Sequence, residues 1–123
     1  MKTLEKMIVA LAPVFALSAP AKADPVRGQA LFVACAACHD VGSKSGQTGP
    51  SLRGVIGRPA GSLSDFRYSR AMLQSGIVWS SENIGLFIQS PQRFIPGNRM
   101  LFSGIQSDED RKDIVDYLSN ISR

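Results

Sequence analysis

The run Cys35-Ala36-Ala37-Cys38-His39 constrains this chain more than any other stretch. Two cysteines three residues apart lie on one face of a helical turn, so both thiols can reach one edge of a porphyrin. The residue that follows, His39, is then carried under the ring, where a neutral imidazole nitrogen can bind iron. His39 is the only histidine among the 123 residues. The run therefore predicts one haem attached through Cys35 and Cys38, with His39 as an iron ligand.

Other interpretations of the same five residues are weaker. A thioredoxin-like redox pair belongs beside a βαβ pattern, and no convincing strand pattern precedes Cys35. A structural zinc site needs four Cys or His ligands, whereas the whole chain has two cysteines and one histidine. A simple disulfide between Cys35 and Cys38 stays open for an exported protein, as does a chance match to the pattern.

Residues 1–23 have the features of a cleavable secretory signal peptide. Lys2 and Lys6 give a basic start, residues 7–19 form an apolar run, and residues 21–23 read Ala-Lys-Ala, an A-x-A cleavage site. The apolar run is shorter than the ~20 residues that a membrane-spanning helix needs. We therefore expect removal of the leader and export to a bacterial periplasm, without stable membrane insertion. An uncleaved anchor is the alternative.

The chain from residue 24 to residue 123 is then expected to form a single domain. It carries 11 basic and 9 acidic residues, and the basic ones are scattered rather than gathered in a run, which gives no support to nucleic-acid binding. A domain of about 100 residues buries only about 60–68% of its unfolded surface and is marginal by itself. A covalently held haem in the core would supply the missing apolar burial.

The pattern of the domain predicts an all-α protein with long loops. Asp24 and Pro25 suit the N-cap and first position of a helix over residues 25–37. No alternating strand pattern occurs, and glycines and prolines break any period between residues 40 and 60. Further helices are expected over residues 65–74 after Ser64, over residues 81–90 after Ser80 or Ser81, and over residues 108–121 after Ser107. Residues 94–100 should be extended or turning.

The sixth ligand of a haem iron decides what the iron can do, and the domain offers two methionines for it. Met72 lies in a helical pattern beside Leu73, where a methionine usually fills the core. Met100 follows Pro96 and Gly97 in a segment that cannot be regular helix, so its side chain can be presented to a ring. Local chemistry favours Met100 and leaves Met72 open.

Taken together, the chain from Asp24 to Arg123 resembles a class I cytochrome c of the mitochondrial and alphaproteobacterial kind. The resemblance rests on an ordered set of pieces. They are Cys35-Ala36-Ala37-Cys38-His39, Thr48-Gly49-Pro50-Ser51-Leu52, Gly54, Gly57-Arg58, Tyr68, Gly76-Ile77-Val78-Trp79, Phe94-Ile95-Pro96-Gly97-Asn98-Arg99-Met100, Phe102-Ser103-Gly104-Ile105 and Asp113-Ile114-Val115-Asp116-Tyr117-Leu118. The C-x-x-C-H run alone occurs in many unrelated haem proteins, but the set with P-G-x-x-M at this distance is highly specific.

The resemblance implies a role for each of eight residues. It makes Cys35 and Cys38 the thioether attachments, His39 and Met100 the axial ligands, Pro50 the carbonyl partner of His39, and Arg58, Tyr68 and Trp79 the donors near the haem propionates. It also implies that the first and last helices cross, with Gly28 and Phe32 packed near Tyr117, while short helices and long loops wrap the haem.

The function that the resemblance implies is one-electron transfer without substrate chemistry. We expect a periplasmic monomer that is not an enzyme and that exchanges electrons with redox proteins such as a bc1-type complex and an oxidase. Two alternatives remain: a dedicated cytochrome subunit of one periplasmic dehydrogenase, and a haem peroxidase or gas-binding protein with a labile sixth ligand. The chain also departs from mitochondrial members, since Phe87 replaces a tyrosine, Met72 replaces an asparagine, and only Lys44 and Lys112 remain as lysines of the domain.

Overall fold

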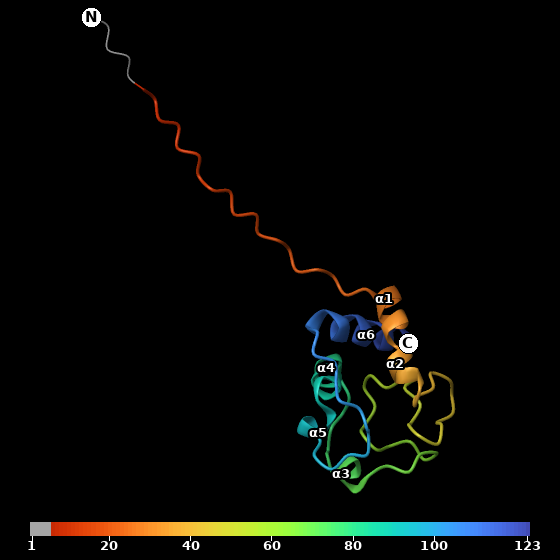
Figure 1. The fold of residues 1–123 in the computed structure, drawn as a ribbon. Helices are drawn as coiled ribbons and strands as arrows, with labels where there is room; N and C mark the ends of the chain where they lie inside the picture. Colours follow the sequence, from red (N-terminus) through yellow and green to blue (C-terminus); the bar gives the residue numbers. More distant parts are fainter. Residues whose placement is uncertain (1–5) are drawn as a thin grey trace, which may run out of the picture.

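The computed structural model describes residues 6–123 as helices joined by long loops (Figure 1). The helices are α1 (Pro25–Leu31), α2 (Val33–Ala36), α3 (Arg70–Leu73), α4 (Ser81–Gln89), α5 (Pro91–Phe94) and α6 (Asp108–Ile121). Within this described part, the strand-like pairing is limited to an isolated antiparallel bridge between Pro59 and Val78. The expected all-α class is confirmed.

The chain ahead of α1 stands apart from the domain. Residues 6–23 are exposed and form neither helix nor strand, and they lead away from the domain in Figure 1. The remaining part of the predicted leader, residues 1–5, lies outside the described residues. No helix of the described chain is long and apolar enough to cross a bilayer. Packing begins at Asp24, whose carboxylate caps α1, and removal of the leader stays a prediction.

The crossing of α1 and α6 is the closest helix contact of the domain. A Cβ atom added to Gly28 would lie 1.9 Å from the carbonyl oxygen of Asp113, so any larger residue would force the helices apart. One turn further along, the ring centroids of Phe32 and Tyr117 are 5.3 Å apart. The expectation that Gly28 and Phe32 pack against the last helix is therefore confirmed.

Polar contacts fix the register of the same crossing. The buried carboxylate of Asp113 accepts the backbone N–H of Asp24 at 2.7 Å through Oδ1, and Nη1 of Arg27 at 2.6 Å through Oδ2. Arg27 also donates through Nη2 to Asp110, at 2.5 Å. These donors lower the pKa of Asp113, the Asp24 N–H most strongly and Arg27 next. The start of α1 is thus tied to the middle of α6.

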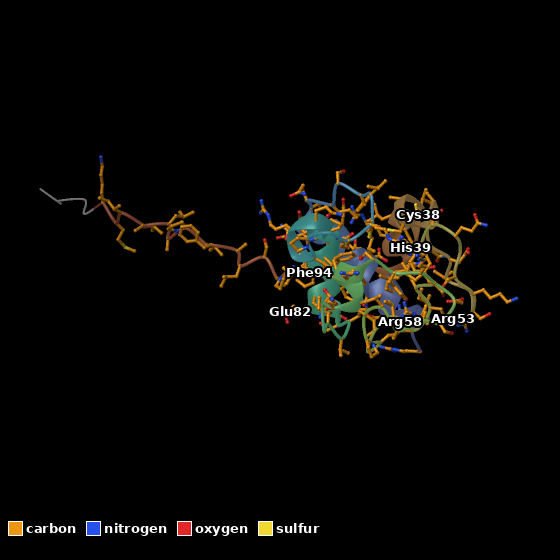
Figure 2. All side chains as sticks on the ribbon, turned by 90° about the horizontal axis from the view of Figure 1, so that it is seen from below. Cys38, His39, Arg53, Arg58, Glu82 and Phe94 are labelled. Atoms are coloured by element: carbon orange, nitrogen blue, oxygen red, sulfur yellow. The ribbon has the colours of Figure 1, made fainter. Side chains whose placement is uncertain are left out.

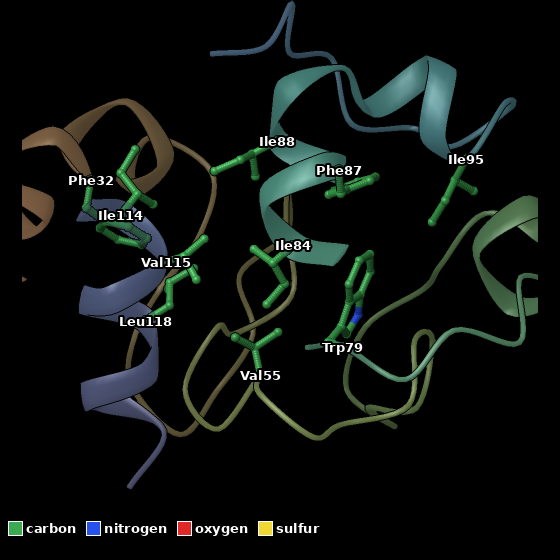
Figure 3. Packing of buried hydrophobic residues seen from close by; sticks show 10 residues of the cluster. All are labelled: Phe32, Val55, Trp79, Ile84, Phe87, Ile88, Ile95, Ile114, Val115 and Leu118. Carbon is green, nitrogen blue, oxygen red and sulfur yellow. The ribbon is translucent and has the colours of Figure 1, made fainter. Parts of the chain in front are cut away.

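The apolar core lies between α4, α6 and the chain around Trp79. Figure 3 shows its ten side chains: Phe32, Val55, Trp79, Ile84, Phe87, Ile88, Ile95, Ile114, Val115 and Leu118. The ring of Phe87 is buried, with its centroid 5.1 Å from that of Trp79. A second group of apolar side chains is only half-buried against this core, and that group matters for the site.

The helix predicted over residues 65–74 is wrong in its first half. Regular helix is limited to α3, and its cap is Ser69, whose Oγ accepts the N–H of Met72 at 3.1 Å. The reason is a tertiary contact, because the carboxylate of Asp65 accepts both the N–H and the hydroxyl of Ser45, at 2.8 and 2.7 Å. Asp65 is thereby held as part of a loop rather than as the first turn of a helix.

The other helix boundaries agree with the sequence within a few residues. Ser80 caps α4 through a capping box with Asn83, and Ser107 caps α6. The first predicted helix is interrupted at Phe32, which separates α1 from α2. Pro91 ends α4 as expected, but it also takes the first position of α5, a short helix that the sequence analysis did not anticipate.

Replacing Gly28 by alanine should weaken the α1–α6 crossing. The added Cβ would overlap the Asp113 carbonyl, and overpacking of this kind costs about 1–3 kcal/mol or more. We expect Gly28→Ala to lower the free energy of unfolding of the haem-loaded protein by at least that amount in guanidinium titration.

Gly85→Ala is the matched control for Gly28→Ala. Gly85 lies inside α4, and no atom of a neighbouring residue lies within 4 Å of the place that a Cβ would take, so alanine should raise stability by up to about 1 kcal/mol. Equal stability of the two variants would show that α1 and α6 are not in close contact at Gly28.

Protonation of the Asp113 carboxylate at low pH should lower the free energy of unfolding. Because its pKa is lowered in the folded state, its carboxylate stabilises the fold above the unfolded value of about 3.9, and this contribution is lost as the pH falls through the folded pKa. Asp113→Asn should therefore be less stable than the unchanged protein at pH 7, and the difference should shrink below about pH 4. Urea titrations across this range measure it. Asp116→Asn, at a half-buried position of the same helix, is the control for the substitution as such.

Candidate haem-binding site

Cys35 lies in α2, and Cys38 and His39 lie on the turn that extends it. The N–H groups of Cys38 and His39 both donate to the carbonyl of Cys35, at 3.0 Å each, so the turn continues past the last helical residue. Cys35 is half-buried, Cys38 is exposed, and both are free thiols in this structure. Burial raises the pKa of the Cys35 thiol. Figure 2 shows Cys38 and His39 on the side of the domain away from Phe94.

The imidazole of His39 is held by one well-defined partner. Its Nδ1 lies 2.8 Å from the carbonyl oxygen of Pro50. Since a carbonyl only accepts, Nδ1 carries the proton and donates, and Nε2 keeps its lone pair for a metal. Burial lowers the pKa of His39, although the Pro50 carbonyl opposes the shift, and the positive charge of Arg58 lowers it further. These conditions favour the neutral imidazole that iron binds.

The Pro50 carbonyl can approach His39 because a glycine precedes it. A Cβ on Gly49 would lie 2.6 Å from the carbonyl oxygen of Cys38 and 2.7 Å from Nδ1 and Cε1 of the His39 ring. Gly49 is buried, and no side chain fits between the loop and the imidazole. The sequence analysis counted Gly49 among the loop breakers and matched it to the family, but only the structure shows this packing role.

Half-buried apolar side chains surround the core on the segments that follow His39. They pack against buried residues, yet part of each surface stays accessible: Val41, Leu52, Ile56, Ala60, Ala71, Met72, Ile77, Phe94 and Met100. An apolar planar group would cover such surfaces at a gain of roughly 25 cal/mol per Å². Together with the free thiols and the oriented imidazole, these residues fit a haem.

The structure brings Arg58 and Trp79 together through the backbone. Trp79 N–H donates to the Arg58 carbonyl at 3.0 Å, and Gly57 N–H donates to the Trp79 carbonyl at 2.7 Å. The Arg58 guanidinium donates to the carbonyls of Ser51 and Arg53, at 2.7 and 3.1 Å. Burial lowers the pKa of Arg58. Arg58 is therefore a half-buried cation held by loop carbonyls, and Figure 2 shows Arg53 and Arg58 at the same edge of the domain.

Tyr68 and Met100, the remaining two residues assigned to the haem, lie on two further loops. Tyr68 is half-buried, with its ring centroid 5.0 Å from that of Phe66 in an edge-to-face arrangement. Met100 is half-buried against the core, and its N–H donates to Oδ1 of Asn98 at 2.8 Å. The roles in haem binding of all eight residues, Tyr68 and Met100 included, stay predictions.

Sequence reasoning missed the residues that hold the Met100 loop in shape. Asn98 is buried, with 6% of its surface exposed, between exposed neighbours. Gln92 donates through Nε2 to the Asn98 carbonyl at 2.9 Å. In the sequence, an asparagine after Pro-Gly is an ordinary turn residue, and only the structure shows that it is buried and that its hydrogen bonds compensate the burial.

Gly49→Ala should impair haem attachment specifically. The added Cβ would displace His39 or the Pro50 carbonyl, so less of the exported protein should carry haem, as measured by the ratio of Soret absorbance to protein mass. Gly46→Ala in the same loop is the control, since its nearest atom would be an ordinary 3.6 Å away. Equal haem content in the two variants would contradict the packing role of Gly49.

Comparison with known proteins places this chain clearly. The family profile described as Cytochrome c matches residues 25–122. Cytochrome c2 from Rhodomicrobium vannielii is 37% identical over 121 residues, which cover 97% of this chain and 96% of that protein. Cytochrome c2 from Rhodoblastus acidophilus is 44% identical over 98 residues, covering 78% and 91%. The solved structure of cytochrome cH from Methylobacterium extorquens superposes with a TM-score of 0.75 at 34% identity, covering 79% of this chain and 98% of that one. The chain therefore belongs to the cytochrome c family, in which the haem is attached covalently to the protein.

Proposed function

We propose that this protein is a soluble periplasmic carrier that moves one electron at a time between redox proteins. The observation that carries the proposal is the free Cys35-x-x-Cys38 pair followed by an imidazole whose Nδ1 is held by Pro50, in a chain of the cytochrome c family. Relatives named cytochrome c2 and a solved cytochrome cH support it.

The proximal side of the site is set by α2 and the loop after it. Cys35 and Cys38 attach the haem, which when bound supplies the reversible Fe(II)/Fe(III) couple. His39 offers Nε2 to the iron, and the Pro50 carbonyl fixes the ring orientation and raises the basicity of the imidazole. This contact would hold the imidazole in one orientation when the iron is bound.

The remaining assigned residues close the site from the other loops. We assign Met100 as the sixth ligand, because a thioether closes the open position and favours the reduced iron. Arg58, Tyr68 and Trp79 are assigned to the propionates, since a buried carboxylate needs donors or a cation. With His39 and Met100 both bound to the iron, no position would be open to a substrate, and we propose a carrier rather than an enzyme.

Export and partners follow from the same assignment. Removal of residues 1–23 after Ala23 would release the domain into the periplasm as a monomer. Electron donors and acceptors of the kind represented by a bc1-type complex and an oxidase are the proposed partners.

The sixth ligand can be tested by optical spectroscopy of the purified haem-loaded protein. We expect a low-spin spectrum with the red Met–iron band in the oxidised form, and no change when carbon monoxide is added to the reduced form. Met100→Leu should abolish the band and allow carbon monoxide to bind, whereas Met72→Leu, the matched control, should do neither.

Two other outcomes would redirect the proposal. Binding of carbon monoxide to the unchanged protein would indicate an open sixth position and favour a haem peroxidase or gas-binding protein. Co-elution with one dehydrogenase in gel filtration of the native extract would instead indicate a dedicated cytochrome subunit.

A further inference from the structure

The loop that carries Met100 is organised by a single buried side chain. Asn98 uses both amide donors and accepts one bond: Nδ2 donates to the carbonyls of Pro91 and Ile95, at 2.8 Å each, and Oδ1 accepts the N–H of Met100, also at 2.8 Å. Its neighbours Gly97 and Arg99 are exposed. Between the apolar contacts of Ile95 and Met100 with the core, Asn98 therefore supplies the attachment of the loop.

Asn98 also links the Met100 loop to a helix. Pro91 is the first residue of α5 and Ile95 follows its last residue, so the amide of Asn98 closes the two ends of α5 onto the loop. From α5, Gln92 returns a bond from Nε2 to the Asn98 carbonyl at 2.9 Å and approaches the Met100 carbonyl at 3.5 Å. The backbone of Met100 is thus fixed on both sides.

We propose that Asn98 is a positioning residue that keeps the sulfur of Met100 on the iron, an inference that rests on the proposed ligand role of Met100. A ligand on a loop leaves the iron whenever the loop opens, so the hydrogen bonds of Asn98 resist ligand exchange. Removing the side chain takes one of two donors from the carbonyls of Pro91 and Ile95 and leaves the Met100 N–H without its acceptor, which weakens the closed loop relative to open ones.

The test measures entry of an external ligand into the oxidised haem-loaded protein. We expect Asn98→Ala to bind imidazole about tenfold more tightly than the unchanged protein, because loss of one or two net hydrogen bonds corresponds to about that factor. Gln92→Ala, at an exposed position, should shift affinity in the same direction by less and keeps the test valid if Asn98→Ala does not fold.

Asn83→Ala is the control for a merely structural effect. Asn83 also accepts a backbone N–H and donates to a backbone carbonyl, those of Ser80 and Val78, but at the start of α4. It should lower stability without changing imidazole affinity. Equal affinities for the Asn98 and Asn83 variants would overturn the proposal, whereas a missing Met–iron band in the unchanged protein would overturn the ligand role of Met100 instead.

A second, independent observation concerns the first residue of the domain. Asp113 is 2% exposed, and one of its two oxygens receives the backbone nitrogen of Asp24. The charges here are unbalanced, because the carboxylates of Asp24, Asp110 and Asp113 surround the single guanidinium of Arg27, which is shared between the last two. A buried carboxylate is costly unless its charge is compensated.

We also propose that the nitrogen of Asp24 becomes a charged α-ammonium that pairs with Asp113, an inference that rests on the proposed cleavage after Ala23. Hydrolysis of the Ala23–Asp24 peptide bond by a signal peptidase consumes one water, leaves a carboxylate on Ala23 and frees the Asp24 amine, which takes up a proton. The atom that now donates as an amide at 2.7 Å then carries the missing positive charge. Leader removal thereby strengthens the contact between α1 and α6.

The charged surroundings of this nitrogen come from three helices. Asp24 and Arg27 belong to the α1 end, and Asp110 and Asp113 to α6. On the outer side, Ala23 lines a groove of about 470 Å³ between α4 and α6 that contains acidic and basic side chains: Glu82, Asp108, Arg111, Lys112 and Asp116. Asp113, which is not one of these groove residues, is the carboxylate that the Asp24 nitrogen contacts.

The test compares two haem-loaded proteins that differ at the amino terminus. In the variant, Gly-Ser inserted after Ala23 leaves the nitrogen of Asp24 as an amide, and the structure already accommodates a preceding chain there. We expect the variant to melt about 4–8 °C lower at pH 7. An amine whose folded pKa is raised stabilises below its unfolded value of about 8 and loses that effect as the pH rises through the folded pKa, so the difference should vanish at high pH.

Two controls separate the possible failures. In an Asp113→Asn background the insertion should have no effect on melting. An equal melting temperature with and without Gly-Ser would overturn the ion pair, whereas an intact mass that starts at a residue other than Asp24 would overturn the cleavage site itself.

Discussion

The close approach of α1 and α6 at Gly28 is the constraint on which the rest of the domain depends. It joins the two ends of the chain, since a helix that starts at Pro25 contacts one that ends at Ile121. Because Gly28 has no side chain, the helix axes come near enough for Asp113 to reach Asp24 and Arg27. The direction of α1 then determines where α2 and the haem-attachment run emerge.

In the loops that follow His39, single contacts rather than regular elements hold the chain in place. The carbonyl of Pro50 holds the imidazole of His39, and the carbonyl of Ser51 accepts a guanidinium N–H of Arg58. The carbonyl of Arg58 in turn accepts the N–H of Trp79. Each link joins segments that are separated along the chain. The site is therefore rigid although its chain is mostly loop, and this rigidity is what a carrier needs when its iron changes charge without moving its ligands.

The sequence predicted the features that local chemistry determines. Caps and periodicity located α1, α4 and α6, and the attachment run located the site. What it could not predict depends on tertiary contacts: Asp65 bonds to Ser45 and so leaves the expected helix, and Asn98 closes α5 onto the Met100 loop. Ser45 and Asn98 lie outside the helical patterns from which the helices were predicted, so helix propensity alone could not predict these hydrogen bonds.

Three of the arginines of the domain hold long loops in place through their guanidinium groups. A chain without helices or sheets leaves many carbonyls without a partner, and these need donors from side chains. Arg58, Arg99 and Arg111 all donate to loop carbonyls, and Arg111 reaches those of Ile105 and Gln106 at 2.7 Å each. A guanidinium offers five donors in a fixed plane, whereas an ammonium is a compact, strongly hydrated charge. Arg58, Arg99 and Arg111 therefore stabilise the loops, and replacing them by lysine would keep the net charge but lose the planar set of donors.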